Sequence, residues 1–219
     1  MKHLKLFATL CCAVLLFAGA KGNENGYEWV DLGLPSGLKW AACNVGATSP
    51  EEYGNYYAWG ETEPKTIYDW STYKWCNGSN TTLTKYNTDS DYGTVDDKTV
   101  LDPEDDAAAV NWGGAWRMPT DAEWTELRTN CTWTWTTKNG VNGYEVKGTN
   151  DNSIFLPAAG YRVGDDLYYA GYYGRYWSSS LSTGSPYNAW YVYFYSGYVS
   201  RSNYYRCYGQ SVRPVLFGE

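Results

Sequence analysis

Hydrophobic and polar positions alternate most regularly near the carboxyl end of the chain, over residues 189–195. Side chains of a strand point alternately to its two faces. One face of this predicted strand carries hydrophobic side chains and the other carries phenols, namely Trp190, Val192 and Phe194, and Tyr191, Tyr193 and Tyr195. Ser196 and Gly197 then predict a hairpin turn, after which residues 198–206 return as a polar strand or loop. We expect the first face to join the core and the tyrosines to form a platform at the surface.

Short strands separated by turns rich in Pro and Gly are predicted elsewhere in the chain on the same grounds. The segments with this pattern are residues 27–32, 34–38, 39–43, 133–135, 144–146 and 154–156, and a further set from residue 161 onward. Residues 66–97 are rich in Asn, Thr, Ser, Asp and Tyr and have no hydrophobic period. We expect this segment to form a long loop over the surface.

Helical signals occur only in the middle of the chain. Residues 102–110 begin with acidic residues and a proline, which suit the positive end of a helix dipole, and continue into alanines. Residues 120–123 (Thr-Asp-Ala-Glu) form a capping-box signature, which places Trp124 and Leu127 on one face of the following helix. Residues 111–119 predict a turn and a short extended stretch between the helices. Strands at both ends with two helices between them indicate an α+β fold of mostly short antiparallel strands.

The amino end has the pattern of a secretory signal peptide. Lysines flank an apolar run over residues 4–18 that is too short to span a bilayer. A small-residue Ala-Gly-Ala site predicts cleavage after Ala20, which divides the chain into a signal peptide over residues 1–20 and a single domain over residues 21–219. A buried amino-terminal helix and a lipid anchor are the alternatives. We expect a product that is secreted, periplasmic or held at the cell surface, without a transmembrane span.

The composition of this expected mature chain disfavours several kinds of chemistry. The only histidine, His3, leaves with the signal peptide, and histidine catalysis or zinc ligation leaves with it. Two lysines leave as well, so 15 of the 17 basic residues remain against 24 acidic ones, and the net charge of −9 argues against a nucleic-acid partner. The four remaining cysteines allow two disulfides in three pairings, or four free buried thiols, at Cys43, Cys76, Cys131 and Cys207.

Tyrosine is concentrated in the last third of the chain. Fourteen of the twenty-three tyrosines lie between residues 161 and 208, interspersed with Ser, Gly and Asn. This mixture is typical of antibody binding surfaces, because Tyr supplies a large, fairly rigid contact while Ser, Gly and Asn supply adaptable hydrogen bonds. The alternative is that tyrosine simply suits β-strands. We favour binding, since Trp, Val and Phe already occupy the expected inward positions.

Three blocks of the sequence carry a resemblance to a known family. They are residues 111–124 (Asn-Trp-Gly-Gly-Ala-Trp-Arg-Met-Pro-Thr-Asp-Ala-Glu-Trp), 176–180 (Tyr-Trp-Ser-Ser-Ser) and 211–215 (Ser-Val-Arg-Pro-Val). With their spacing, over about residues 28–215, they resemble the Fibrobacter succinogenes major paralogous domain family. The resemblance implies a C-type-lectin-like fold related to that of the formylglycine-generating enzymes, whose Arg-Leu-Pro-Thr-Glu-Ala-Glu-Trp run is similar to residues 117–124.

The carboxyl-terminal part is similar to the variable proteins of diversity-generating retroelements. In those proteins, adenines of a template repeat are mutated during reverse transcription, so that Asn codons come to encode Tyr, Ser, Asp or Gly. The resemblance implies a hypervariable-type region over about residues 161–210. The ligand contacts that it implies are Tyr187, Asn188, Tyr191, Tyr193, Tyr195, Ser196, Tyr198, Ser200, Ser202, Asn203, Tyr204, Tyr205 and Tyr208.

Two departures from these families bear on activity. The formylglycine-generating enzymes hold copper with a pair of cysteines near the carboxyl end, where this chain has only Cys207. Lectins that bind sugar through calcium carry Glu-Pro-Asn or Gln-Pro-Asp and Trp-Asn-Asp motifs, which residues 63–65 (Glu-Pro-Lys) and 188–190 (Asn-Ala-Trp) do not match. We therefore expect no catalytic residue, no metal ligand and no cofactor.

Two acidic clusters are interpreted as structural. Residues 89–97 hold four aspartates around Gly93 without the spacing of an EF-hand, so we expect a solvated acidic loop, with a bound calcium ion as the alternative. Residues 102–106 hold four carboxylates, which we interpret as helix capping rather than acid and base catalysis.

The sequence thus predicts a secreted or cell-surface protein that is not an enzyme and serves recognition or adhesion. Its expected partner is a macromolecular ligand, protein or glycan, at a cell or phage surface. Two alternatives stay open. One is an oxidase related to the formylglycine-generating enzymes, and the other is a structural component of a surface layer or pilus.

Overall fold

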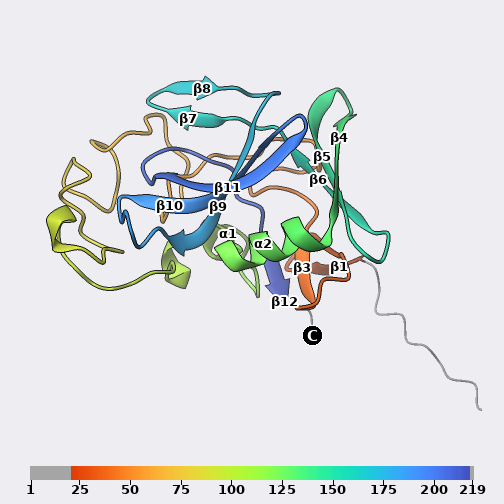
Figure 1. The fold of residues 1–219 in the computed structure, drawn as a ribbon, viewed down its shortest axis with the longest axis horizontal. Coiled ribbons are helices and arrows are strands. Elements are labelled where there is room, and N and C mark those ends of the chain that lie inside the picture. The colour runs from red at the N-terminus through yellow and green to blue at the C-terminus, as the bar shows by residue number, and fades with distance from the viewer. Residues whose placement is uncertain (1–20, 218–219) are drawn as a thin grey trace, which may run out of the picture.

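The chain alternates short strands with long irregular loops (Figure 1). The computed structural model describes residues 21–217, so the expected signal peptide lies outside the described residues. The helices over this range are α1 (Ala107–Trp112) and α2 (Asp121–Asn130), with 3-10 turns at Ser90–Tyr92 and Pro103–Asp105. The strands are β1 (Lys21–Glu24), β2 (Tyr27–Asp31), β3 (Leu38–Ala41), β4 (Thr132–Lys138), β5 (Val141–Lys147), β6 (Ser153–Pro157), β7 (Tyr161–Val163), β8 (Asp166–Tyr168), β9 (Gly174–Leu181), β10 (Asn188–Tyr195), β11 (Tyr198–Tyr205) and β12 (Val215–Phe217). The predicted α+β class is confirmed.

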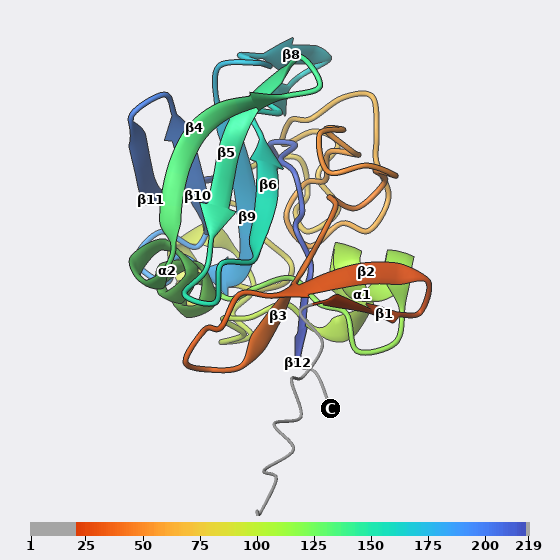
Figure 2. The same ribbon diagram turned by 90° about the vertical axis from the view of Figure 1, so that its right-hand side faces the viewer.

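The strands of the described chain pair in four small antiparallel sheets. The sheet β1-β2-β3-β12 brings both ends of this chain together, with Val215 opposite Trp40. Figure 2 shows the sheet β4-β5-β6 beside the sheet β9-β10-β11, and the hairpin β7-β8 lies above both in Figure 1. The predicted hairpin after β10 is confirmed, since Tyr195 faces Tyr198 across the two-residue turn. In that turn Gly197 has a φ of 81°, a backbone conformation that favours glycine.

Helix α2 begins at the predicted capping box. The Thr120 hydroxyl accepts from the Glu123 amide at 3.3 Å, and the Glu123 carboxylate accepts from the Thr120 amide at 2.8 Å. Two unpaired amides at the start of the helix are thereby satisfied. Trp124 and Leu127 are buried, as their shared face predicts, and they hold α2 against β9 and β10.

The first helix differs from the prediction. A 3-10 turn covers Pro103–Asp105, and α1 begins only after Asp106, whose carboxylate accepts from the amides of Ala108 and Ala109. The helix then continues to Trp112, so the predicted turn over residues 111–119 starts later than expected. The cause is the Asp106 side chain, which caps this later position and also accepts from the Met118 amide at 2.8 Å. The interpretation of this carboxylate as a helix cap is confirmed.

The sheet β9-β10-β11 has a hydrophobic cluster on each face. On the side of α2 and the sheet β4-β5-β6, the cluster includes Trp124, Leu127, Tyr144, Leu156, Tyr176, Val192 and Phe194. On the opposite side, the cluster includes Tyr57, Trp59, Trp116, Trp177, Leu181 and Tyr191. Loops from the amino half therefore cover part of the face that the sequence assigned to the surface.

Residues 66–97 form the predicted long loop, with the 3-10 turn Ser90–Tyr92 as its one helical element. A buried guanidinium, that of Arg206, fastens this loop to the carboxyl-terminal segment. It donates to the carbonyls of Tyr86, Pro186 and Lys85 at 2.7 to 2.9 Å and to the Tyr73 hydroxyl at 2.9 Å. This charged group adds four hydrogen bonds to the packing of Tyr68, Tyr73 and Tyr86, which are buried although the loop has no hydrophobic period.

The four cysteines of the described range are free thiols, as the second of the two predicted arrangements has it, but only Cys207 is buried, while Cys43, Cys76 and Cys131 are partly exposed. Cys207 is buried, and burial raises the pKa of its thiol far above the ordinary value. No helix within residues 21–217 is long and apolar enough to cross a membrane.

Candidate ligand-binding surface

Strand β10 presents its two faces as the alternation predicts. Val192 and Phe194 are buried in the cluster on the α2 side. The three tyrosines lie on the opposite face, and their exposure rises along the strand. Tyr191 is 5% exposed, Tyr193 is half-buried, and Tyr195 is 38% exposed. The face is therefore closed at one end and open at the other.

The prediction that Tyr191 belongs to the surface is wrong. Its ring packs edge-on against Trp177, with 5.9 Å between centroids, in a cluster that also holds Tyr57. The Trp177 indole donates to the Tyr57 carbonyl at 2.9 Å, so a loop from the amino half covers this end of the face. Burial raises the pKa of the Tyr191 phenol. Strand alternation assigns a side chain to a face, but it does not reveal what covers that face.

The neighbouring strands continue the tyrosine face. Arg175 of β9 and Ser200 of β11 lie directly opposite Tyr193 on either side. Directly opposed residues of antiparallel strands share a face. At the open end, the Tyr198 ring stacks on Tyr195, with 5.1 Å between centroids and 20° between planes.

The hairpin β7-β8 adds tyrosines that the sequence reasoning did not include among the contacts. Tyr173 meets Tyr195 at 5.4 Å and Tyr169 at 5.0 Å, and Tyr161 stacks near both Tyr168 and Tyr169. The high tyrosine content of residues 161–173 was the signal that pointed to them. We name the combined area the tyrosine surface, which consists of Tyr161, Tyr168, Tyr169, Tyr173, Arg175, Tyr193, Tyr195, Tyr198, Ser200, Ser202 and Tyr204.

Three further predicted contacts, Tyr187, Tyr205 and Tyr208, form an aromatic group beside Tyr204 of this surface. Tyr204, which is 41% exposed, meets Tyr205 at 5.0 Å and Tyr208 at 5.4 Å. Tyr205 meets Tyr187, which in turn meets Tyr92 of the long loop at 4.9 Å. Burial raises the pKa of Tyr208 to about 12. The group therefore connects the tyrosine surface with the loop over residues 66–97.

Two predicted contacts lie on the other side of the sheet. Asn188 donates to Asn203 at 2.9 Å, and both share the face of Trp190, which points towards α2. The Arg201 guanidinium covers the Trp190 ring at 4.3 Å and pairs with Asp121 of α2. The structure therefore does not bring Asn188 and Asn203 together with the tyrosine surface. Their side chains point to the opposite face of the sheet. Ser196 lies in the exposed turn between β10 and β11.

Two phenols of the tyrosine surface are linked by a hydrogen bond. The hydrogen bond to Tyr198 raises the pKa of Tyr193 to about 12. Hydrogen bonds with Ser200 and Tyr193 lower the pKa of Tyr198. Both hydroxyls are therefore neutral at neutral pH.

In the acidic loop over residues 89–97, the Asp96 carboxylate forms hydrogen bonds to backbone amides. Asp96 accepts from the amides of Tyr86, Asn87 and Lys98 at 2.8 to 3.2 Å. These bonds close the loop over residues 86–98, and they give Asp96 a role that needs no ligand.

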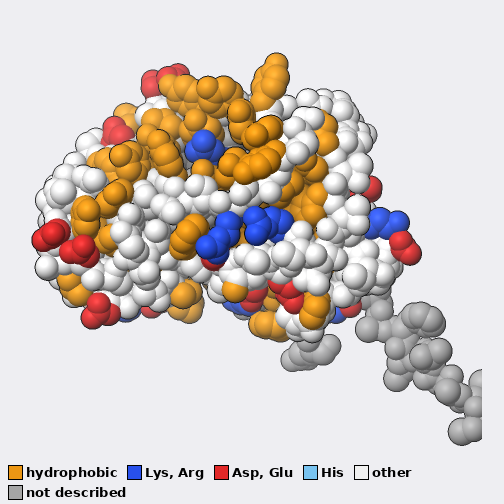
Figure 3. Space-filling view, in the orientation of Figure 1, with side chains coloured by type: hydrophobic (Ala, Val, Ile, Leu, Met, Phe, Trp, Pro, Cys, Tyr) orange, Lys and Arg blue, Asp and Glu red, His pale blue; other side chains and the backbone are white. Residues whose placement is uncertain are grey.

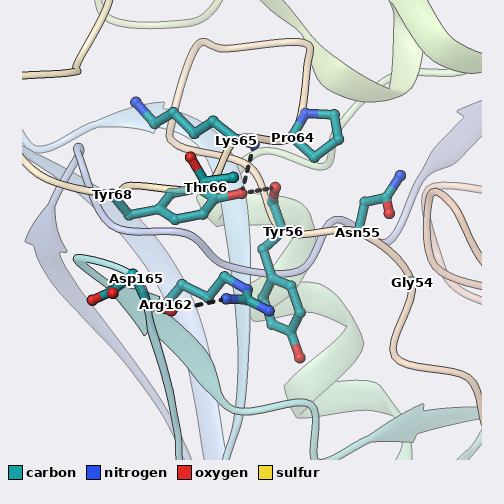
Figure 4. A pocket seen from close by; sticks show the side chains of 9 residues that line it. All are labelled: Gly54, Asn55, Tyr56, Pro64, Lys65, Thr66, Tyr68, Arg162 and Asp165. Atoms are coloured by element: carbon teal, nitrogen blue, oxygen red, sulfur yellow. Dashed lines mark hydrogen bonds between the residues drawn. The ribbon is translucent and has the colours of Figure 1, made fainter.

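A cavity of about 500 Å³ is lined by residues 54–56, by residues 64–66 and 68, and by Arg162 of β7 (Figure 4). Its two cations are already engaged. Lys65 pairs with Glu61 at 2.9 Å, while Arg162 donates to the Asp165 carbonyl and lies over the Tyr56 ring. A second cavity, of about 430 Å³, lies between β2 and α1, with Tyr27 and Trp112 in its lining. Both cavities are separate from the tyrosine surface, which is an open face rather than a pocket.

Comparison with known families gives one match. A family model described as a domain of unknown function (DUF8237) matches residues 132–215, the part that runs from β4 to the start of β12. Comparisons with curated proteins and with solved structures find no match to this chain.

Proposed function

We propose that this protein is a recognition protein, not an enzyme, and that it binds a macromolecular ligand through the tyrosine surface. The observation that carries the proposal is the contrast between two kinds of tyrosine. Tyr56, Tyr73 and Tyr176 are buried and donate to backbone carbonyls at 2.5 to 2.7 Å, so the fold needs them. Tyr169, Tyr195 and Tyr198 are 38 to 55% exposed, and their rings pack against other tyrosines. Contiguous exposed aromatic area of this kind marks interaction sites.

The proposal includes the C-type-lectin-like fold and diversification of about residues 161–210. Its support is that β10 and β11 combine a buried scaffold face, which includes Val192 and Phe194, with an open face of Tyr and Ser. Open-face residues of this kind can change without loss of the core. Sequencing the neighbouring DNA tests diversification. A reverse transcriptase gene and a near-copy of the 3′ coding segment that differs at adenines are expected, and their absence would contradict it.

Export completes the proposal. The apolar run over residues 4–18 and the Ala-Gly-Ala site at residues 18–20 support a secreted or surface-held product. Amino-terminal sequencing of the exported protein is expected to start at Lys21. Retention of residues 1–20 in a cell-internal product would contradict this part.

A phage-displayed library of random peptides provides a defined probe for binding. Peptides selected on the full chain are expected to lose affinity about tenfold or more with the double variant Tyr195→Ser and Tyr198→Ser, because exposed aromatic anchors carry most of the energy of such contacts. Phe217→Ala is the matched control, since Phe217 is an exposed aromatic residue in β12, in a different sheet. Selected peptides that bind the double variant as well as the original chain would refute the assignment of the site.

The enzyme alternative has little support at Cys207. Thiol oxidation and copper ligation both use the thiolate. Cys207 is fully buried, and desolvation raises the pKa of its thiol. The environment of this thiol therefore favours a structural role.

A further inference from the structure

Arg175 of β9 lies within the tyrosine surface, surrounded by aromatic rings. Its guanidinium carbon is 3.6 Å from the centroid of the Tyr161 ring, 5.4 Å from Tyr191 and 5.7 Å from Tyr204. The rings come from β7, β10 and β11, so three strands besides its own shape this environment. Arginine stacks in this way on electron-rich ring faces.

The hydrogen bonding of Arg175 differs from that of four other arginines, of which Arg206 and Arg213 are buried and Arg117 and Arg201 are partly exposed. Arg206 and Arg213 each make four hydrogen bonds to protein groups. Arg117 and Arg201 pair with Glu123 and Asp121.

Arg175 has none of these partners. Its Nε and Nη1 atoms are buried, and within residues 21–217 they donate to nothing. No carboxylate of the described chain lies within ion-pair distance of this guanidinium. Arg117 and Arg201, by contrast, each form an ion pair. Buried donors without an acceptor are costly, and more so when they carry charge. The ring stacking offsets part of that cost. The Nη2 atom also has no hydrogen-bond partner in the described chain, and it is not among the buried atoms, so it is the donor that a ligand can reach.

The charges on this side of the molecule have a matching arrangement. Figure 3 shows basic side chains towards the middle of the face, one of them ringed by hydrophobic side chains, while most acidic side chains lie nearer its margins. Basic side chains are thus present on this face, although the chain as a whole is acidic.

We propose that Arg175 is the anion-binding centre of the tyrosine surface and that it receives a carboxylate from an acidic side chain, Asp or Glu, of a protein ligand. This inference rests on the proposed function. A carboxylate oxygen would accept from the accessible Nη2, and such a charge-assisted hydrogen bond is stronger than a neutral one. The rings of Tyr161 and Tyr204 then flank the hydrocarbon stem of the acidic side chain.

A protein is the partner that fits the shape. The tyrosine surface is an open face, and both cavities described above lie elsewhere. Open faces rich in tyrosine suit the broad, flat contacts made between proteins, whereas small ligands are enclosed in pockets.

Peptides selected on the full chain from the phage-displayed library test the proposal. We expect them to share an Asp or Glu at one position. Replacement of that residue by its amide is expected to weaken binding about tenfold or more. Arg175→Gln is expected to weaken binding of the acidic peptide by a similar factor. The amide change is expected to add little once Arg175 has been replaced, because both changes remove the same pair.

Arg201→Gln is the matched control, since Arg201 also covers an aromatic ring in this sheet but already has Asp121 as its partner. We expect this variant to bind the peptide within about twofold of the original chain. Arg175→Lys keeps the positive charge but not the planar guanidinium. It replaces the Gln variant in the experiment if that variant does not fold. Its expected affinity lies between those of the original chain and the Gln variant.

The outcomes separate the two proposals. Binding that depends on Tyr195 and Tyr198 but not on Arg175 or on an acidic residue of the peptide overturns the carboxylate site and leaves the tyrosine surface as the binding site. Binding that does not change when Tyr195 and Tyr198 are replaced counts against both proposals. Failure to select any peptide counts against both as well. Selective binding of glycans that carry carboxylates, measured on a glycan array, overturns the choice of a protein ligand.

Discussion

At the scale of single residues, tyrosine performs two different jobs in this chain. The buried tyrosines act as hydrogen-bonded core residues. The Tyr176 hydroxyl donates to the Pro157 carbonyl at 2.7 Å, and the Tyr73 hydroxyl donates to the Trp59 carbonyl at 2.6 Å. These hydrogen bonds satisfy the buried hydroxyls, while the rings fill volume in the core. The tyrosines of the tyrosine surface lack such backbone acceptors among the described residues. Tyr168 donates to the Asp166 carboxylate at 3.3 Å, and Tyr193 is hydrogen-bonded to Tyr198, so these hydroxyls bond to side chains at the surface.

The buried phenols predict a loss of stability at alkaline pH. Desolvation raises the pKa of Tyr176 from 10.0 to about 12, and it raises the pKa values of Tyr56, Tyr73 and Tyr86 further still. Above pH 10 the unfolded chain releases these protons while the folded chain retains them, so deprotonation favours unfolding. The stabilisation is complete below pH 10 and decreases as the pH rises towards 12. Urea unfolding at a series of pH values measures the free energy of unfolding.

Tyr176→Phe provides the control for this pH dependence. Removal of one titrating phenol is expected to reduce the slope of stability against pH by roughly 1.4 kcal/mol per pH unit in this range. The variant has a lower stability at neutral pH as well, because the Pro157 carbonyl loses its donor. An unchanged slope would show that Tyr176 does not contribute to the alkaline transition.

At the scale of elements, strand β10 shows how far alternation alone can lead. The sequence correctly separated Val192 and Phe194 from the tyrosines, since alternation is a property of the strand itself. Burial is a property of neighbours. Tyr191 is covered by a loop around Tyr57 that lies more than a hundred residues earlier in the chain, and nothing in the strand pattern encodes that contact.

The gradient of burial along β10 predicts unequal effects of equal substitutions. Tyr191→Ala is expected to lower the free energy of unfolding by roughly 3–5 kcal/mol, because it leaves a cavity beside Trp177. Tyr195→Ala is expected to change it by less than about 1 kcal/mol, because that ring is largely at the surface. Urea unfolding of both variants measures the difference, and equal losses would contradict the burial gradient.

Local signals fixed the other elements to different degrees. The capping box before Trp124 and the hairpin turn at Gly197 were predictable, since each depends on residues a few positions apart. The start of α1 was not, because Asp106 competes with the acidic residues before it and is held by the distant Met118 amide. Arg175 escaped notice for the same reason. Its environment is assembled from three other strands, and its own segment gives no sign of it.

At the scale of the whole molecule, buried arginines join parts of the chain that lie far apart in the sequence. Arg213 donates to the carbonyls of Ala41, Ala42 and Phe155 and to the Asn44 side chain, which joins β3 and β6 to the carboxyl end. Arg206 does the same for the long loop. Because this loop also supplies Tyr92 to the aromatic group beside the tyrosine surface, its anchorage and the shape of the binding face are linked.

Replacement of Arg206 tests this linkage. Arg206→Met is expected to lower the free energy of unfolding by roughly 3–5 kcal/mol, because the carbonyls of Lys85, Tyr86 and Pro186 lose a buried charged donor together. Hydrogen exchange of the backbone amides is expected to rise most in residues 66–97, and less in α2, which Arg206 does not contact. Arg162→Met is the matched control, since Arg162 is only half-buried and makes a single hydrogen bond, to the Asp165 carbonyl. If the two variants lose the same stability, or if exchange rises evenly over the chain, then the loop is held by contacts other than the Arg206 guanidinium.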